Sequence, residues 1–175
     1  MHVGRSLGSP HKFFNMTLAI GIDPGTATTG YGLVRETRDG SLEAVDFGVI
    51  TTPKDISDAE RLDMLYQQLG AILKQYQPVT SGVEKLFFQK NISTAITVGQ
   101  ARGVILLALA QAGLNVAEYT PNEVKLAVSG YGSADKRQVQ EMVRILLALP
   151  TIPKPDDAAD ALAIAICHLH SYRFR

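Results

Sequence analysis

Leu18-Ala19-Ile20-Gly21-Ile22-Asp23 is a short apolar stretch that ends in a carboxylate. An apolar run of this length, followed by the turn residues Pro24 and Gly25, is typical of a buried central strand. A carboxylate at the end of such a strand is costly unless another group uses its charge. The stretch therefore predicts a sheet-based fold with a functional acid at the edge of its sheet.

Three further carboxylates lie where an α/β fold brings distant segments together. Glu84 follows Ser81-Gly82-Val83, and Asp157 and Asp160 open the last helical pattern of the chain. If the strand of Glu84 lies parallel to that of Asp23, both acids emerge at the same edge of the sheet. Asp157 and Asp160 are three residues apart and therefore share one face of a helix. Hard oxygen ligands in this arrangement favour a divalent metal that acts on a phosphodiester, so the chain is predicted to be an enzyme.

The remaining pattern predicts an α/β fold. Strands are expected at 18–23, 31–36, 44–51, 82–86 and 115–119, with turns over 24–30 and 38–41. Helices are expected from Ser57 to Tyr76, at about 93–112, from Thr120 onward, and at about 133–149 and 157–171. Capping boxes mark the first and third of these helices, and Asp156 is expected to cap the last. A β meander followed by alternating strands and helices favours the ribonuclease H-like fold, a five-stranded mixed sheet flanked by helices on both faces.

The composition is that of an ordinary globular chain. At 175 residues, with 46% hydrophobic and 19% charged residues, the sequence predicts one domain. We expect residues 1–15 to be a disordered N-terminal extension and residues 16–175 to form a single nuclease domain. No apolar run reaches membrane-spanning length, and the single cysteine, Cys167, favours a reducing cytoplasm.

The charge distribution bears on nucleic-acid binding. The formal net charge is zero, whereas nucleic-acid-binding proteins often carry a basic excess. Basic residues nevertheless gather in the middle and later parts of the chain, at Lys85, Lys90, Arg102, Lys125, Lys136, Arg137 and Arg144. Cations bound by the four acids would also make the loaded protein more positive. A nucleic-acid substrate therefore stays compatible with the zero net charge.

Several motifs occur in order along the chain, and together they resemble a known family. They are Ile20-Gly21-Ile22-Asp23-Pro24-Gly25, Glu84 in its strand, Gly99-Gln100-Ala101-Arg102-Gly103, Gly130-x-Gly132-Ser133-Ala134-x-Lys136, and Asp157-Ala158-Ala159-Asp160-Ala161-Leu162-Ala163. Their order and spacing resemble the RuvC family of Holliday junction resolvases from about Met16 to His170. The resemblance implies a homodimeric, magnesium-dependent endodeoxyribonuclease that nicks two opposing strands of a four-way DNA junction in recombination and repair. It also implies a cytoplasmic location, a RuvA–RuvB branch-migration complex as partner, and no membrane.

The resemblance carries over residue by residue. Asp23, Glu84, Asp157 and Asp160 match the catalytic acids, which would hold two Mg²⁺ ions, with Mn²⁺ as a substitute. The first acid of the terminal pair is histidine in some members, so Asp157 is a permitted variant. The resemblance also implies residues that contact DNA. Phe87 matches an aromatic that stacks on unpaired bases, with Phe88 and Lys90 beside it in the same loop. Lys125 and Lys136 match basic residues near the scissile strand.

Plainer interpretations remain for some of these residues. Phe87 and Phe88 alternate on an extended segment, so one can pack in the core while the other contacts DNA, and the sequence leaves open which. Glu84 could pair with Lys85 or Lys90 instead of a metal. Helix capping would account for one or two of the terminal acids, but it does not account for Asp160.

The helix at 93–112 predicts the oligomeric state. Ala95, Gly99 and Gly103 recur every four residues, and the run 104–110 is apolar all round. A helix without a polar face must be covered on every side, so we expect a second subunit on the side that the sheet leaves open. The alternative is burial by the chain's own neighbours.

Three other functions remain open at this point. Asp23-Pro24-Gly25-Thr26-x-x-x-Gly30 resembles the phosphate loop of the actin and sugar-kinase ATPases, although those enzymes need two such domains and the chain is too short. An RNA-processing nuclease on the same fold is a second alternative. A nucleic-acid-binding module without catalysis is a third.

Overall fold

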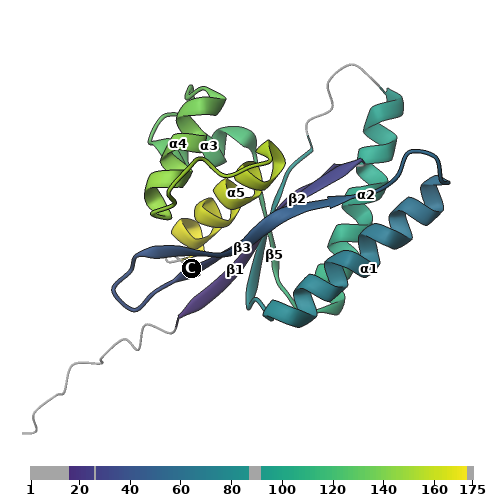
Figure 1. The fold of residues 1–175 in the computed structure, drawn as a ribbon, viewed down its shortest axis with the longest axis horizontal. Helices are drawn as coiled ribbons and strands as arrows, with labels where there is room; N and C mark the ends of the chain where they lie inside the picture. Colours follow the sequence, from purple (N-terminus) through teal and green to yellow (C-terminus); the bar gives the residue numbers. More distant parts are fainter. Residues whose placement is uncertain (1–15, 26, 87–91, 173–175) are drawn as a thin grey trace, which may run out of the picture.

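A five-stranded mixed sheet forms the centre of the computed structural model, which describes residues 16–25, 27–86 and 92–172 (Figure 1). Its strand order is β3-β2-β1-β4-β5. The strands are β1 (Thr17–Asp23), β2 (Thr28–Glu36), β3 (Leu42–Thr51), β4 (Thr80–Glu84) and β5 (Val116–Tyr119). The first three form an antiparallel meander, and β4 and β5 extend the sheet in parallel from β1. The predicted neighbour relation between the strands of Asp23 and Glu84 is confirmed.

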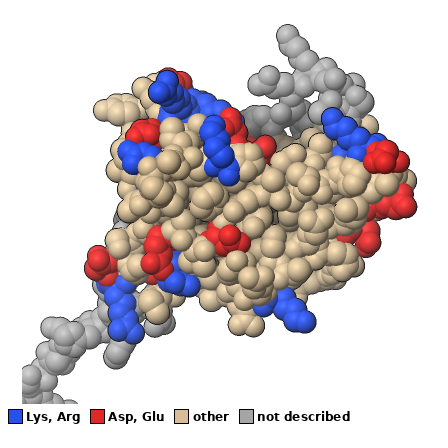
Figure 2. Space-filling model, viewed as in Figure 1, with Lys and Arg blue, Asp and Glu red and all other residues tan. Residues whose placement is uncertain are grey.

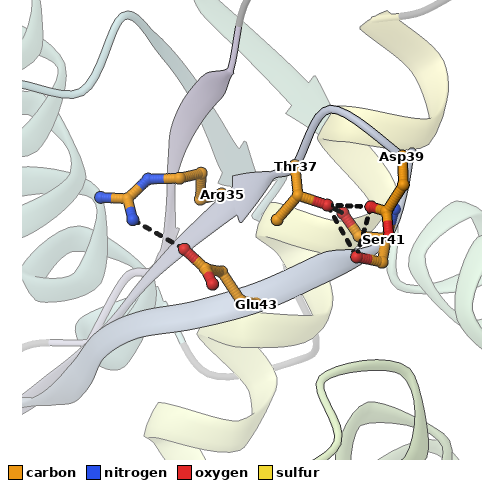
Figure 3. Close-up of polar contacts among 5 residues, drawn as sticks. All are labelled: Arg35, Thr37, Asp39, Ser41 and Glu43. Atoms are coloured by element: carbon orange, nitrogen blue, oxygen red, sulfur yellow. Dashed lines mark hydrogen bonds and ion pairs between the residues drawn. The ribbon is translucent and has the colours of Figure 1, made fainter.

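The turn between β2 and β3 is built from side chains as well as backbone (Figure 3). The Asp39 carboxylate accepts hydrogen bonds from the Thr37 hydroxyl and from the backbone N–H of Ser41, the latter over 3.1 Å. Gly40 has a φ of 85°, a left-handed conformation that glycine adopts without steric cost. Beside the turn, Arg35 donates to Glu43 across the strand pair over 2.6 Å. The turn predicted at 38–41 therefore lies where the Asp-Gly pair placed it.

Helices cover both faces of the sheet, as the sequence predicts. They are α1 (Asp58–Tyr76), α2 (Ile92–Gln111), α3 (Pro121–Ser129), α4 (Lys136–Leu146) and α5 (Asp156–Tyr172). Along β1 the side chains alternate: Ile20 and Ile22 pack beneath α1 and α2, while Ala19 packs on the opposite side with α5. Figure 1 shows α1 and α2 on one side of the sheet and α5, with α3 and α4 beyond it, on the other.

Several predicted boundaries differ from the observed ones, most clearly in two segments. Residues 28–30 were expected in a turn, but they extend β2 because Thr28 and Gly30 pair with Thr51 and Val49 of β3. The predicted strand 82–86 lies earlier, since β4 begins at Thr80 and ends at Glu84. Both boundaries depend on pairing between strands, which a local pattern does not contain.

Two helix starts also differ from the sequence prediction. Helix α4 begins at Lys136, not near residue 133, because the Asp135 side chain caps it by accepting a hydrogen bond from Gln138 N–H. The prediction that Asp156 caps the last helix is wrong: α5 begins at Asp156 itself. The predicted capping boxes at Ser57 and Thr120 are both confirmed.

Within the described residues, the helices lack the combination of length and apolar character that a membrane span requires. The predicted N-terminal extension, residues 1–15, lies outside the described part of the chain.

Candidate active site

Two neighbouring strands bring the first two acids together. Ile22 of β1 pairs with Val83 of β4 in parallel register, so Asp23 and Glu84 are the next residues along adjacent strands and end at the same edge of the sheet. The carboxyl groups of Asp23 and Glu84 share a hydrogen bond. Such a bond requires one of the two groups to hold a proton. The Asp23 and Glu84 side chains are therefore in contact, as the parallel arrangement of their strands predicts.

Helix α5 brings the other two acids to this edge because its backbone lies directly on the sheet. A Cβ atom added to Gly30 of β2 would stand 2.0 Å from the backbone oxygen of Asp157. A Cβ atom at Gly21 of β1 would stand 2.2 Å from the backbone oxygen of Ala161. No side chain fits at either position, so glycine permits the close approach. The first turn of α5, with Asp157 and Asp160, is thereby fixed above the ends of the strands.

The acids share a partly buried and strongly negative environment. Burial raises the pKa of Asp23 to about 8, and the charges of Glu84, Asp160 and Asp157 add to the rise. Burial also raises the pKa of Glu84, with a further contribution from Asp160. The pKa of Asp160 is raised by burial too, although the ammonium of Lys136 opposes this effect. Like charges held together in this way are stabilised by a proton or by a bound cation.

Lys136 reaches into this cluster from the first position of α4. Its ammonium donates to Asp160 Oδ2 over 2.9 Å and lies 3.5 Å from Asp156 Oδ2. Burial opposes the charge of Lys136, but the bond to Asp160 and the neighbouring carboxylates outweigh it and raise the pKa of the lysine. Sequence reasoning singled out Lys136 as a DNA contact, and the structure adds its direct bond to a predicted catalytic acid.

A hollow of about 280 Å³ opens beside the cluster. Two acids and two lysines contribute to its wall: Glu84, Asp160, Lys125 and Lys136. Lys125 comes from α3, which follows β5 directly and starts at the same edge of the sheet. A larger hollow of about 660 Å³ lies between α1 and α2 near Gln77 and Pro78, at the opposite edge, and no acid lines it. The smaller hollow is therefore the one that lies beside the predicted acids.

The donor set suits a hard divalent cation, since all four predicted ligands supply carboxylate oxygens. In the described ranges, no three acidic, histidine or cysteine side chains are already arranged to hold an ion. In this structure Asp160 accepts a hydrogen bond from Lys136, and Asp23 shares a hydrogen bond with Glu84. An ion held by these acids would take the place of the hydrogen bond between Asp23 and Glu84 and of the Lys136 ammonium at Asp160.

Three predicted DNA contacts lie outside the described residues: Phe87, Phe88 and Lys90. Their segment joins β4 to α2, so it starts within three residues of Glu84. Sequence reasoning missed the contacts of Asp156, whose Oδ1 accepts from Lys154 over 2.7 Å while its Oδ2 faces Lys136. The only local signal was the pair Lys154-x-Asp156. Opposite charges this close in sequence do not by themselves indicate a site.

Helix α2 carries an exposed stripe on the side away from the sheet. Ile96, Gln100, Gly103 and Leu107 are exposed at helical spacing, while Ala101 and Ile105 are buried against the sheet. Cβ atoms at Gly99 and Gly103 would meet no atom within 4 Å. The chain's own described neighbours therefore leave this face uncovered, in keeping with the predicted covering by a second subunit.

Comparison with known proteins matches nearly the whole described chain. A family model described as "Crossover junction endodeoxyribonuclease RuvC" matches residues 19–168. The protein of that name from Roseiflexus sp. (strain RS-1) is 61% identical over 155 residues, which cover 89% of this chain and 92% of the relative. Its counterpart from Chloroflexus aggregans (strain MD-66 / DSM 9485) is 63% identical over 154 residues, covering 87% of this chain and 93% of the relative.

Solved structures give the same result for the fold. "T. thermophilus RuvC in complex with Holliday junction substrate" is 32% identical, with a TM-score of 0.83 over 90% of this chain and 96% of the other. The yeast mitochondrial Holliday junction resolvase Ydc2 is 14% identical, with a TM-score of 0.66 over 94% of this chain and 85% of the other. The second likeness concerns the fold alone.

Proposed function

Because this chain belongs to the RuvC family of crossover junction endodeoxyribonucleases, we propose that it resolves four-way DNA junctions by paired cuts at the carboxylate cluster. Its 61% identity to a named crossover junction endodeoxyribonuclease covers 89% of the chain, and that relative is covered almost entirely as well. The observation that carries the assignment of the site is the convergence of Asp23, Glu84, Asp157 and Asp160 at one edge of the sheet. The enzyme is a hydrolase of recombination and repair.

The acids provide the metal site. The family is dependent on divalent metal, and we assign two Mg²⁺ ions to Asp23, Glu84, Asp157 and Asp160, with Mn²⁺ able to replace them. A bound ion supplies positive charge at the scissile phosphate and lowers the barrier to attack by water. The raised pKa of Asp23 supports this assignment, because its causes are burial first and the charges of the neighbouring acids second, and a bound dication would offset both.

The protein's other side chains bind and orient the DNA. Lys125 and Lys136 line the hollow next to Glu84 and Asp160, where their ammonium groups can hold the phosphate that is cut. Figure 2 shows further Lys and Arg side chains gathered over α3 and α4, with acidic side chains among them. Phe87 is assigned to stacking on an unpaired base, and Phe88 and Lys90, from the same segment of sequence, to contacts with the DNA.

The exposed face of α2 supports a homodimer. Its apolar and small residues, Ile96, Gly103 and Leu107, offer a surface on which a second copy of the helix can approach closely. Two sites related by a two-fold axis would cut a symmetric junction at matching positions. From the resemblance to the family, we also propose that the protein works in the cytoplasm alongside a RuvA–RuvB branch-migration complex.

One experiment tests the function against its alternatives. The protein is incubated with a synthetic four-way junction, a linear DNA duplex, linear RNA and ATP, each with and without Mg²⁺. We expect paired nicks in the four-way junction and in none of the other substrates, and only when Mg²⁺ is present. The Asp160→Asn variant should not cleave the junction. Preferred cutting of RNA, hydrolysis of ATP, or junction binding without cleavage would each support one of the alternatives and contradict the proposal.

A further inference from the structure

Lys136 contacts two carboxylates on the same turn of α5, and only one of them belongs to the proposed metal site. The ammonium lies 2.9 Å from Asp160 Oδ2 and 3.5 Å from Asp156 Oδ2. The two acids are four residues apart, so their side chains are neighbours on the helix surface. The lysine therefore bridges a predicted metal ligand and an acid with no assigned function.

Asp156 is itself held in place by a second lysine. Its Oδ1 accepts a hydrogen bond from Lys154 over 2.7 Å, so its two oxygens face two different ammonium groups. Lys154 lies just before α5 and contacts the other oxygen of the Asp156 carboxylate than the one that faces Lys136. The Asp156 side chain is 47% exposed, against 33% for Asp160, so it stands nearer the rim of the site than the acid that binds the ion.

A divalent ion and the Lys136 ammonium compete for Asp160. If an ion took this carboxylate, the lysine would lose its shorter bond, and its side chain, which is 56% exposed, could swing into solvent. Asp156 already lies close to the same ammonium, so a small movement of the lysine would convert the longer contact into a direct bond. The lysine can then stay at the hollow while it gives up the metal ligand.

We propose that Asp156 is a positioning residue, a second anchor that retains the Lys136 ammonium beside the site when a divalent ion takes Asp160. The proposal rests on the assignment of Asp160 as a metal ligand. Asp156 would not touch the DNA or the ion; it would act only through Lys136. Its removal should therefore have two effects, one on metal affinity and one on turnover.

The effect on metal affinity can be measured without DNA. MgCl₂ is titrated calorimetrically into the wild type, Asp156→Asn, Lys136→Met and the double variant. Lys136→Met should tighten Mg²⁺ binding because it removes the competing ammonium. Asp156→Asn should weaken binding in the wild-type background by about 3-fold more than in the Lys136→Met background, the size typical of an exposed ion pair. Equal effects in both backgrounds would show a general loss of negative charge and would overturn the proposal.

The effect on turnover separates positioning from structure. Asp156→Asn should lower kcat about 3- to 10-fold, with KM for the junction changed less than about 2-fold, because Lys136 is no longer retained at the phosphate. Asp156→Glu keeps the charge and should restore most of kcat. Glu141→Gln is the matched control, since it removes a carboxylate paired with Arg144 on α4 outside the site. Failure of rescue by Asp156→Glu, with an equal loss in Glu141→Gln, would make Asp156 merely structural.

A further variant keeps the two proposals apart. If Asp160→Asn leaves Mg²⁺ binding unchanged, the assignment of the metal site fails, and the anchor fails with it. If Asp160→Asn abolishes binding while Asp156 shows no coupling to Lys136, only the anchor fails.

Discussion

Asp23→Asn should stabilise the metal-free protein while it abolishes cleavage. The carboxyl group of an unfolded aspartate loses its proton near pH 3.8, whereas burial and the neighbouring acids raise the pKa of Asp23 to about 8 in the folded state. Between these values the folded protein holds a proton that the unfolded chain releases. A group whose pKa is raised by folding contributes most to stability at a pH below its pKa in the unfolded chain. This contribution is lost as the pH rises toward its pKa in the folded protein.

The size of the effect follows from the two pKa values. Relative to low pH, where Asp23 is protonated in both states, its raised pKa lowers the free energy of unfolding by up to about 4 kcal/mol at pH 7. At pH 5 the reduction is about 1–2 kcal/mol. Asparagine has no proton to release, and its amide can still donate a hydrogen bond to Glu84 as the protonated carboxyl does. We expect Asp23→Asn to raise the free energy of unfolding by at least about 1 kcal/mol at pH 7, and by less at pH 5.

Urea unfolding in EDTA at pH 5, 7 and 9 measures this difference. Asp63→Asn is the matched control, because Asp63 is an exposed carboxylate on α1. Repeating the series in Mg²⁺ should narrow the gap at pH 7, since the ion stabilises the wild type by binding its folded state alone. If Asp23→Asn is no more stable than the wild type in EDTA at any pH, the acid is not under the electrostatic strain that the argument requires.

Three other outcomes are expected. Asp160→Asn should lower the cleavage rate by at least about 10²-fold on a four-way junction while gel-shift affinity persists, and a loss of binding would contradict this. Gly103→Leu should shift sedimentation at micromolar concentration from dimer to monomer, and a monomeric wild type would remove the premise. Lys125→Ala should reduce the slope of log affinity against log salt by about one, whereas Phe87→Ala should lower cleavage and leave the slope unchanged. Equal slopes for the two variants would refute the division between phosphate and base contacts.

Local signals in the sequence were sufficient for much of the site. The adjacency of Asp23 and Glu84 followed from two apolar strands running parallel, a relation that the fold type enforces. The start of α3 followed from Thr120 and Glu123, which cap the helix within four residues of each other. The cap depends only on neighbours in the chain, so the sequence contains it in full, whereas the adjacency of the two acids came from the expected fold type.

Other features depend on packing between distant elements and could not be predicted. The contact of Lys136 with Asp156 joins two helices across 20 residues of sequence, and no spacing rule applies to it. The extent of β2 depends on pairing with β3. On α2, apolar residues occupy both faces, so the pattern could not show that Ile96 and Leu107 are exposed while Ile105 is buried.

The direct contact between α5 and the glycines of the sheet has a consequence for biosynthesis. Asp157 and Asp160 reach the strand ends only when the backbone of α5 lies against Gly21 and Gly30, and α5 is the last helix of the described chain. A nascent chain on the ribosome therefore exposes two of the four acids early but lacks the other two until α5 emerges. If the four acids form the metal site as proposed, a partly synthesised or locally unfolded form in which α5 is detached lacks two of the ligands and should not cleave DNA. For the proposed junction endonuclease, this arrangement would make cleavage depend on the completed packing of α5 against the sheet.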